Sequence, residues 1–343
     1  MEDLKNREFS TNPNFKFKQV AKETKCCFGI NDIFDIYYAL NENNELYLIS
    51  ADNNSSISII RLRDNKLVKN LEGENGNSTI YMIRHFYNKF NQKDYCISSF
   101  KRSIIKIWDL TDNYNIMHSI KIEYSENTRI YSCLLYFPDK NTNYFITSSN
   151  ESEENDYTNI YDLEKGTLIS NLKNTNRVDV FYLLLWENNK IDYLIQCCIY
   201  IVLIFNLQTK KLINILRKDD TTIHNSACII KKNEISYLYV GNINGIIDIW
   251  NLNNFQLNGI VKYKKSYFYH LLSWNNRYIL VANKSDESII IIDTMTNKVI
   301  SVIKNLNENI IISLKKINHP LYGEALLSSG NDHKIKLYIL NPN

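Results

Sequence analysis

The chain has 343 residues, of which 44% are hydrophobic, and its 24 Tyr and 14 Phe favour a sizeable core built from strands. Its 40 basic and 37 acidic residues leave a net charge of +3, and this balance argues against a nucleic-acid-binding protein. The seven Cys include no Cys-x-x-Cys pair and no His at ligand spacing, which argues against a disulfide framework and a zinc site.

The N-terminal residues lack the apolar stretch of a signal peptide. The longest apolar run, residues 194–205, contains Gln196 and is too short to span a bilayer. We therefore expect a soluble protein in a reducing compartment, in the cytoplasm or alternatively in the nucleus.

The first predicted element is a strand within residues 14–20, with the sequence FKFKQV over 15–20. After it, one short pattern recurs through the chain: an alternating apolar strand that closes on a large apolar residue, which we call the anchor. The anchors are Ile60, Trp108, Tyr161, Phe205, Trp250, Ile292 and Tyr338. Their spacings of 48, 53, 44, 45, 42 and 46 residues, with a Trp-Asp pair at the second, are typical of four-stranded propeller blades.

Each repeat also begins with a first strand, which is marked by two mostly apolar residues at positions i and i+3. These opening pairs are Ile33/Ile36, Ile80/Ile83, Ile130/Cys133, Val180/Leu183, His224/Ala227, Phe268/Leu271 and Ile311/Leu314. The predicted units cover about residues 31–73, 78–122, 128–173, 177–218, 222–262, 266–304 and 308–341.

The seventh repeat ends after its third strand, and the spare strand at 14–20 supplies the missing fourth strand. A ring closed in this way leaves no open sheet edge in its last blade. The sequence therefore predicts one all-β domain over residues 1–343, a seven-bladed β-propeller whose last blade is completed by the N-terminal strand.

The chain resembles the WD-repeat β-propeller family over nearly its whole length. Trp108-Asp109 matches the Trp-Asp pair of that family, and Trp250-Asn251 is close to it. The structural Asp of the family, six residues before the Trp, corresponds to Asp286 and Asp332, with Asn54, Asn155 and Asn244 in three other blades. Arg102 and Ile199 depart from the pattern, and the Gly-His dipeptide is missing. The resemblance implies a platform for partner proteins; we expect the Trp to pack against the next blade and the Asp to begin a turn.

No catalytic motif stands out. The loop GENGNST (73–79) lacks the Lys of a phosphate-binding P-loop, and neither a Gly-x-Ser-x-Gly nor a His-Glu-x-x-His motif is present. We expect no enzyme activity, no catalytic residues, no cofactor and no metal. The acidic loop 151–156 and the basic, Tyr-containing segment KYKKSY (262–267) are interpreted as solvated loops, with partner selection and lipid or RNA contact as the alternatives.

Aromatic residues recur one position after the start of the opening pair, on the innermost strand, along which side chains alternate. The resemblance to WD-repeat proteins implies that side chains at this position reach the mouth of the central channel. Together with three charged residues one position before the pair, they form the predicted funnel residues: Phe34, Tyr81, Tyr131, Phe181, Tyr269, Asp32, Asp179 and Arg129. Either these rings simply pack in a Tyr-rich chain, or they capture a side chain of a partner. Aromatic faces and two Asp favour a basic side chain.

These observations predict a non-enzymatic scaffold that binds proteins or peptides on one face, within a larger complex. Nucleic acid is not expected as a partner, nor is a transmembrane segment, while peripheral membrane contact stays open. The alternatives are a phosphoinositide-binding propeller, although LRKDD (216–220) lacks the second Arg and the Gly of that motif, and an enzyme with axial Asp32 and Asp179. Because folds do not fix functions, the site must decide between them.

Overall fold

The computed structural model describes residues 15–19, 24–25, 33–38, 45–51, 56–61, 64, 66–72, 80–100, 104–121, 129–139, 141–150, 157–173, 179–218, 223–304, 310–319, 323–330 and 334–342. Within these ranges the regular structure consists of β-strands, without a helix. The chain divides into two compact units, one of residues 27–215 and one of residues 1–26 and 216–343.

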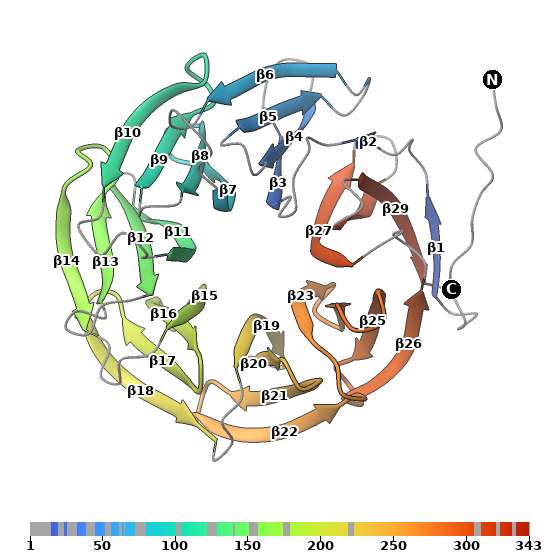
Figure 1. Cartoon of the computed structure of the whole chain (residues 1–343). Helices are drawn as coiled ribbons and strands as arrows, with labels where there is room; N and C mark the ends of the chain where they lie inside the picture. Colours follow the sequence, from blue (N-terminus) through green and yellow to red (C-terminus); the bar gives the residue numbers. More distant parts are fainter. Residues whose placement is uncertain are drawn as a thin grey trace, which may run out of the picture. The chain divides into compact units, whose positions relative to one another are not determined.

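The unit of residues 27–215 contains the first four blades (Figure 1). Blade 1 consists of β3 (Ile33–Tyr38), β4 (Leu46–Ala51), β5 (Ser56–Arg61) and β6 (Lys66–Glu72). Blade 2 consists of β7 (Ile80–Asn88), β8 (Lys93–Phe100), β9 (Ile104–Asp109) and β10 (Asn115–Lys121). Blade 3 consists of β11 (Arg129–Asp139), β12 (Thr142–Asn150), β13 (Tyr157–Asp162) and β14 (Leu168–Lys173). Blade 4 consists of β15 (Val180–Asn188), β16 (Ile191–Cys198), β17 (Ile201–Asn206) and β18 (Lys211–Arg217).

The other unit contains the remaining three blades. Blade 5 consists of β19 (His224–Lys232), β20 (Ile235–Asn242), β21 (Ile246–Asn251) and β22 (Gln256–Lys262). Blade 6 consists of β23 (Phe268–Trp274), β24 (Tyr278–Asn283), β25 (Ser288–Asp293) and β26 (Lys298–Lys304). Blade 7 consists of β27 (Ile311–His319), β28 (Gly323–Gly330), β29 (Lys334–Pro342), β1 (Phe15–Gln19) and β2 (Thr24–Lys25).

The strands of the first six blades follow one another in chain order across each sheet, and every pairing is antiparallel. The first strands of consecutive blades contact each other, as β3, β7, β11 and β15 do in one unit and β19, β23 and β27 do in the other. Each unit is thus a run of blades joined along their first strands, with the fourth strands at the outer edge (Figure 1). The fold is a seven-bladed β-propeller, as the sequence predicts.

The last blade takes its outer strand from the N-terminus. Strand β1 pairs with β29 in antiparallel register, with Phe17 opposite Leu340 and Gln19 opposite Tyr338. This confirms the predicted pairing of FKFKQV with the last blade. The short strand β2, which the repeat pattern does not predict, pairs with the other end of β29 through Thr24 and Ile335.

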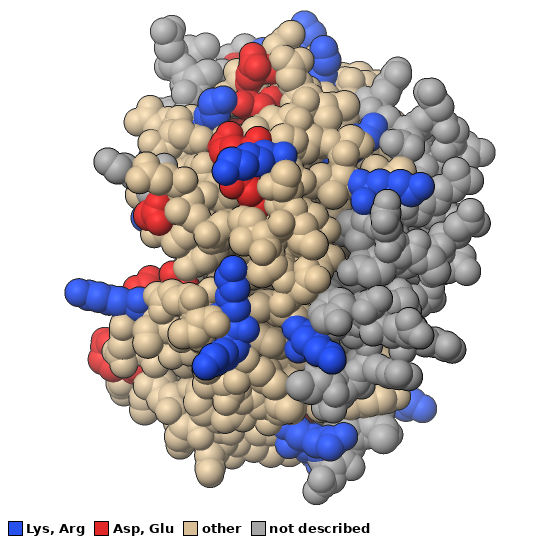
Figure 2. Space-filling view, turned by 90° about the vertical axis from the view of Figure 1, so that its left-hand side faces the viewer, with Lys and Arg blue, Asp and Glu red and all other residues tan. Residues whose placement is uncertain are grey.

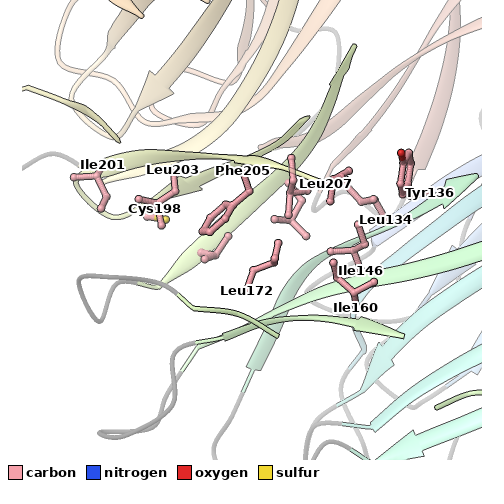
Figure 3. Close-up of a cluster of buried hydrophobic side chains, with 13 residues drawn as sticks. Leu134, Tyr136, Ile146, Ile160, Leu172, Cys198, Ile201, Leu203, Phe205 and Leu207 are labelled. Atoms are coloured by element: carbon pink, nitrogen blue, oxygen red, sulfur yellow. The ribbon is translucent and has the colours of Figure 1, made fainter. Parts of the chain in front are cut away.

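The residues that define the repeat form the core. All seven anchors are buried, and so are the six opening pairs from Ile80/Ile83 onward. Figure 3 shows the cluster between blades 3 and 4, where Phe205 of β17 lies near Ile146, Ile160 and Leu172 of blade 3. Burial of the repeat positions explains why large aliphatic and aromatic residues recur there, since apolar area removed from water is the main driving force of folding.

The predicted direction in which Trp108 packs is wrong. Trp108 shares a buried cluster with Ile49, Ile57 and Leu71 of blade 1, which is the preceding blade and not the next one. Its neighbours Ile105 and Ile107 instead join the cluster shared with blade 3. Alternation along a strand separates the two faces, but it does not reveal which neighbour each face meets.

Asp109 begins the turn to the outer strand, as predicted. Its Oδ1 accepts hydrogen bonds from the backbone N–H groups of Thr111 (2.9 Å) and Asp112 (3.1 Å). Its Oδ2 pairs with Lys93 Nζ at 2.7 Å.

The outer strands expose aliphatic side chains, including Ile116 on β10, Leu168 on β14 and Ile213 on β18. Figure 2 views the molecule from the side on which β10 and β14 lie, and uncharged atoms cover much of this surface between separate Lys and Arg side chains. Several of these strands end on an exposed basic residue, such as Lys121 and Lys173. Such charges at sheet edges oppose pairing with other chains.

Candidate functional site

The position of the predicted aromatic funnel residues coincides with a β-bulge. The pairing of the first and second strands shifts register between Ile80 and Met82, between Arg129 and Ser132, between Val180 and Tyr182 and between Phe268 and His270. Tyr81, Tyr131, Phe181 and Tyr269 lie within these shifts and have no partner across the sheet. Blades 5 and 7 have the same shift, at Asn225 and Ile312. A bulge of this kind re-aims a side chain, which suits a recognition site.

Blade 1 differs from the others. Phe34 pairs regularly with Ser50, and the ladder of β3 and β4 continues without a shift. Phe34 therefore follows the ordinary alternation of its strand, although the sequence places it in the same series as Tyr81 and Tyr131.

The structure describes the side chains of two aromatic funnel residues. Both side chains are partly exposed, and each follows a buried residue in the chain. These are Phe181, after the buried Val180, and Tyr269, after the buried Phe268. Asp179 is also partly exposed. The side chains of Phe34, Tyr81, Tyr131 and Arg129, and the whole of Asp32, lie outside the described residues. Phe181 and Tyr269 belong to different units, so the convergence of the eight funnel residues on one opening stays a prediction.

The residue that follows the bulge connects neighbouring blades. Ser132 Oγ accepts a hydrogen bond from the backbone N–H of Leu183 at 3.0 Å, and Ser226 Oγ accepts one from Leu271 at 2.9 Å. His270 Nδ1 accepts the equivalent bond from Leu314 at 3.0 Å. The repeat pattern does not predict this role, although a polar residue recurs between the members of the opening pairs. A buried backbone donor satisfied in this way fixes the bulge and its neighbour in one position.

Tyr269 takes part in a cluster with Tyr267 and Lys284. The two Tyr ring centroids lie 5.1 Å apart. Lys284 Nζ lies 5.3 Å from each centroid and 3.4 Å from the Tyr269 hydroxyl oxygen. A cation at this distance is attracted by the negative faces of the rings. A lysine of the same chain thus already lies over the Tyr269 ring, and the meeting of Tyr269 with a basic side chain of a partner stays a prediction.

A second stacked cation lies on the first strands of the other unit. The Arg84 guanidinium carbon of β7 is 5.1 Å from the ring centroid of Tyr182 on β15. Tyr182 directly follows the funnel residue Phe181, and both Arg84 and Tyr182 are partly exposed. The contact therefore joins the first strands of blades 2 and 4.

Asp286, one of the two matches to the structural Asp of the WD-repeat family, stabilises the turn after β24. It accepts hydrogen bonds from Ser288 and Asn283, and it pairs with Lys264 Nζ at 2.7 Å. Burial alone would raise the pKa of Asp286, but the bonds from Lys264 and Ser288 hold that pKa below its ordinary value. Asp332, Asn54 and Asn155 lie outside the described residues.

The remaining sequence motifs are only partly described. The loops GENGNST (73–79) and 151–156 lie outside the described residues, as do Asp219 and Asp220 of LRKDD. Lys218 of the same motif pairs with the buried Asp248 at 3.0 Å. In KYKKSY, Lys262 and Lys265 are exposed, whereas Lys264 is the partner of Asp286.

Within the described ranges, neither a candidate metal site nor a candidate membrane-spanning helix occurs. No group of three or more His, Cys, Asp and Glu side chains is placed there to hold a metal ion. The described part of the chain also has no helix of the length and apolar character needed to cross a membrane. All five described cysteines are buried free thiols.

Comparison with protein-family models gives no match, and comparison with curated proteins gives none either.

Proposed function

We propose that the protein is a WD-repeat-like scaffold that binds partner proteins or peptides through the bulge residues of its first strands, and that it is not an enzyme. The observation that carries this proposal is the recurrence of the bulge: in six blades the register shifts at the same step of the first strand, and in four of them an aromatic residue lies within the shift. Bulges are over-represented next to functional sites, where they re-aim a side chain.

The chemistry of these residues suits protein recognition. Tyr and Phe contribute large contact areas and lose little conformational entropy, and such residues dominate the binding energy of many interfaces. The hydrogen bonds from Leu183 to Ser132 and from Leu271 to Ser226 hold the strands in place before a partner arrives. Pre-organisation of this kind reduces the cost of binding.

Two features support a relationship with WD-repeat proteins. The Trp-Asp pair ends the third strand of blade 2, with Trp108 buried and Asp109 at the turn. The matched Asp286 makes hydrogen bonds within its turn. Such proteins serve as interaction platforms, and we propose a cytoplasmic location within a larger complex for this chain.

The proposal is tested first on the funnel residues with a native partner, identified by affinity purification and mass spectrometry. We expect Tyr131→Ala and Phe181→Ala each to weaken partner binding by about tenfold or more, the effect of losing an aromatic hot spot. The melting temperature should change little because both side chains are expected to point out of the core. Lys69→Ala on the outer strand β6 serves as the control and should change neither quantity. If both aromatic variants bind the partner normally, the interaction surface lies elsewhere.

The same protein preparations separate the two alternative functions. Flotation with phosphoinositide vesicles that is lost on substitution of Lys262 and Lys265 would favour a membrane-binding propeller, since both lysines are exposed. Hydrolase activity that is lost in Asp179→Asn would favour an enzyme with axial carboxylates.

A further inference from the structure

Lys284 is a positive charge that lies over two aromatic rings and has no carboxylate partner among the described residues. Its ammonium lies over Tyr267 and Tyr269, and none of the carboxylates of the described residues pairs with it. Asp286 of the same turn is engaged with Lys264 at 2.7 Å. Glu287, also in this turn, is exposed but does not pair with Lys284. Lys284 itself is exposed, so its remaining N–H donors face solvent.

Arg84 repeats this arrangement in the other unit. Its guanidinium lies over Tyr182, and no described residue forms a hydrogen bond or an ion pair with the Arg84 side chain. Its charge nevertheless acts locally: burial raises the pKa of the Cys133 thiol to about 12, and Arg84 opposes that rise. A stacked guanidinium keeps its planar set of donors available for a carboxylate or a phosphoryl group.

Both cations lie next to the bulge positions to which the proposed function assigns partner binding. Lys284 contacts the funnel residue Tyr269 directly, and Arg84 contacts the residue that follows Phe181. The exposed Lys262 and Lys265 add positive charge on the segment that leads to Tyr267, and neither is paired with a carboxylate in the described part of the chain. A cation fixed on an aromatic ring has lost part of its side-chain entropy before binding, and it therefore pairs with an anion at lower cost.

We infer that Lys284 in one unit and Arg84 in the other each receive an anionic oxygen group of a partner segment, so that each of these two positions selects acidic rather than basic peptides. This inference rests on the proposed function, because it assigns the charge preference of the same site. It reverses the expectation from sequence, in which the aromatic rings attract a cation. The rings are occupied by the cations of the chain itself, and the charge that a partner meets at these two positions is positive.

The test measures the binding of three fluorescein-labelled peptides to the full-length protein by anisotropy: octaglutamate, octalysine and octaglutamine. We expect octaglutamate to bind more tightly than the other two. Lys284→Gln and Arg84→Gln should each weaken octaglutamate binding by about tenfold, the loss expected for one charge-assisted hydrogen-bonded contact. Lys284→Arg should retain binding because it keeps the charge.

Two variants with the same change of charge serve as matched controls. Lys298 begins the outer strand β26 and Arg217 ends the outer strand β18, and both side chains are exposed. Lys298→Gln and Arg217→Gln should leave octaglutamate binding nearly unchanged, and thermal melting should show that all variants remain folded. Equal weakening by Lys284→Gln and Lys298→Gln would contradict the inference, because the net charge would then account for binding. Tighter binding of octalysine would contradict it as well.

A Gly-Ser octapeptide with one phosphoserine separates the two sources of the anionic group. If the phosphoserine peptide binds more tightly than octaglutamate and its binding depends on Lys284, the anionic group of the partner is a phosphoryl group. If octaglutamate binds more tightly, the group is a carboxylate. Flotation with phosphoinositide vesicles that depends on Lys284, without binding of either acidic peptide, would overturn the peptide assignment.

Failure of this inference differs from failure of the proposed function. If Tyr131→Ala and Phe181→Ala weaken a native partner while octaglutamate does not bind, only the charge preference is wrong. If octaglutamate binding depends on Lys284 while the funnel variants bind the native partner normally, the binding of acidic peptides at Lys284 is confirmed and the assignment of the bulge residues is wrong.

Discussion

At the scale of single residues, Trp108 shows how one side chain connects two blades. Its ring is buried among residues of blades 1 and 2, and its indole N–H donates a hydrogen bond to Ser98 Oγ at 3.0 Å. The Lys106 ammonium lies 5.9 Å from the ring centroid. The side chain thus contributes apolar burial and one satisfied polar contact within the core.

We expect Trp108→Ala to lower the free energy of unfolding by about 3–5 kcal/mol, the cost of removing a large buried aromatic side chain. Trp108→Phe keeps most of the volume and should cost less, since it removes mainly the hydrogen bond to Ser98. Urea unfolding monitored by circular dichroism measures both variants. A Trp108→Ala protein that unfolds like the wild type but loses its partner would identify Trp108 as a contact residue.

Gly245 occupies a position that a side chain cannot enter. Its φ is +76°, and a Cβ atom built there would lie 2.4 Å from the backbone oxygen of Lys264. The turn after β20 is therefore in close contact with the segment that carries Lys264 and leads to Tyr267.

Gly323 provides a matched comparison for a substitution of Gly245. It has a similar φ of +70°, but no atom of the described residues lies within 4 Å of its built Cβ. Both Gly→Ala changes introduce the strain of a positive φ, about 1 kcal/mol. We expect Gly245→Ala to lower the melting temperature clearly more than Gly323→Ala, because only the former displaces backbone. Equal decreases in the melting temperatures of the two variants would show that the close approach to Lys264 does not affect stability.

At the scale of elements, strand β1 is the outer strand of the blade that ends the chain. It covers β29 along the register from Phe15–Pro342 to Gln19–Tyr338. Without it, β29 would expose a row of unpaired backbone groups, which is a template for association with other chains.

Deletion of residues 1–21 should therefore cause aggregation or a large loss of thermal stability. Deletion of residues 1–14 removes only what precedes β1 and serves as the control, with an expected melting temperature close to that of the full chain. Light scattering during a thermal ramp measures both effects. If the protein without residues 1–21 melts like the full-length protein, β1 does not stabilise the last blade.

At the scale of the whole molecule, ion pairs in both units link stability to pH. Burial alone would raise the pKa of Asp109, but hydrogen bonds from Lys93 and Thr111 hold it below its ordinary value. A hydrogen bond from Lys316 lowers the pKa of Glu324, and Asp286 behaves like Asp109. A carboxyl group with a lowered pKa in the folded state stabilises the protein above its unfolded-state pKa, and this contribution is lost as the pH falls through the folded-state value.

We expect the melting temperature to be highest near neutral pH and to fall steeply below about pH 4, where these carboxylates take up protons. Asp109→Asn should have a lower melting temperature at neutral pH and a smaller further decrease in acid. Differential scanning calorimetry across this range checks both expectations. An equal acid-induced decrease in the wild type and in Asp109→Asn would show that Asp109 does not contribute to the pH dependence.

The sequence by itself determined the blades and the strand that completes the last one. The anchors recur with a period mostly in the forties of residues. Because each blade consists of consecutive strands joined by short turns, this repeat can be recognised directly in the sequence. The alternation of apolar residues likewise predicted the buried opening pairs. It also predicted the shared position of Tyr131 and Phe181, one residue after the start of each pair. The missing fourth strand of the last blade followed from counting strands.

Only the tertiary structure decided which neighbours those residues meet. The sequence does not reveal that Trp108 faces the preceding blade, because alternation assigns two faces without identifying the neighbour on either side. It also does not reveal the bulge, which requires the register of two paired strands. The stacking of Lys284 on Tyr267 and Tyr269, and of Arg84 on Tyr182, joins residues from separate strands. Such contacts depend on how strands approach in space, and a periodic pattern in one strand carries no information about them.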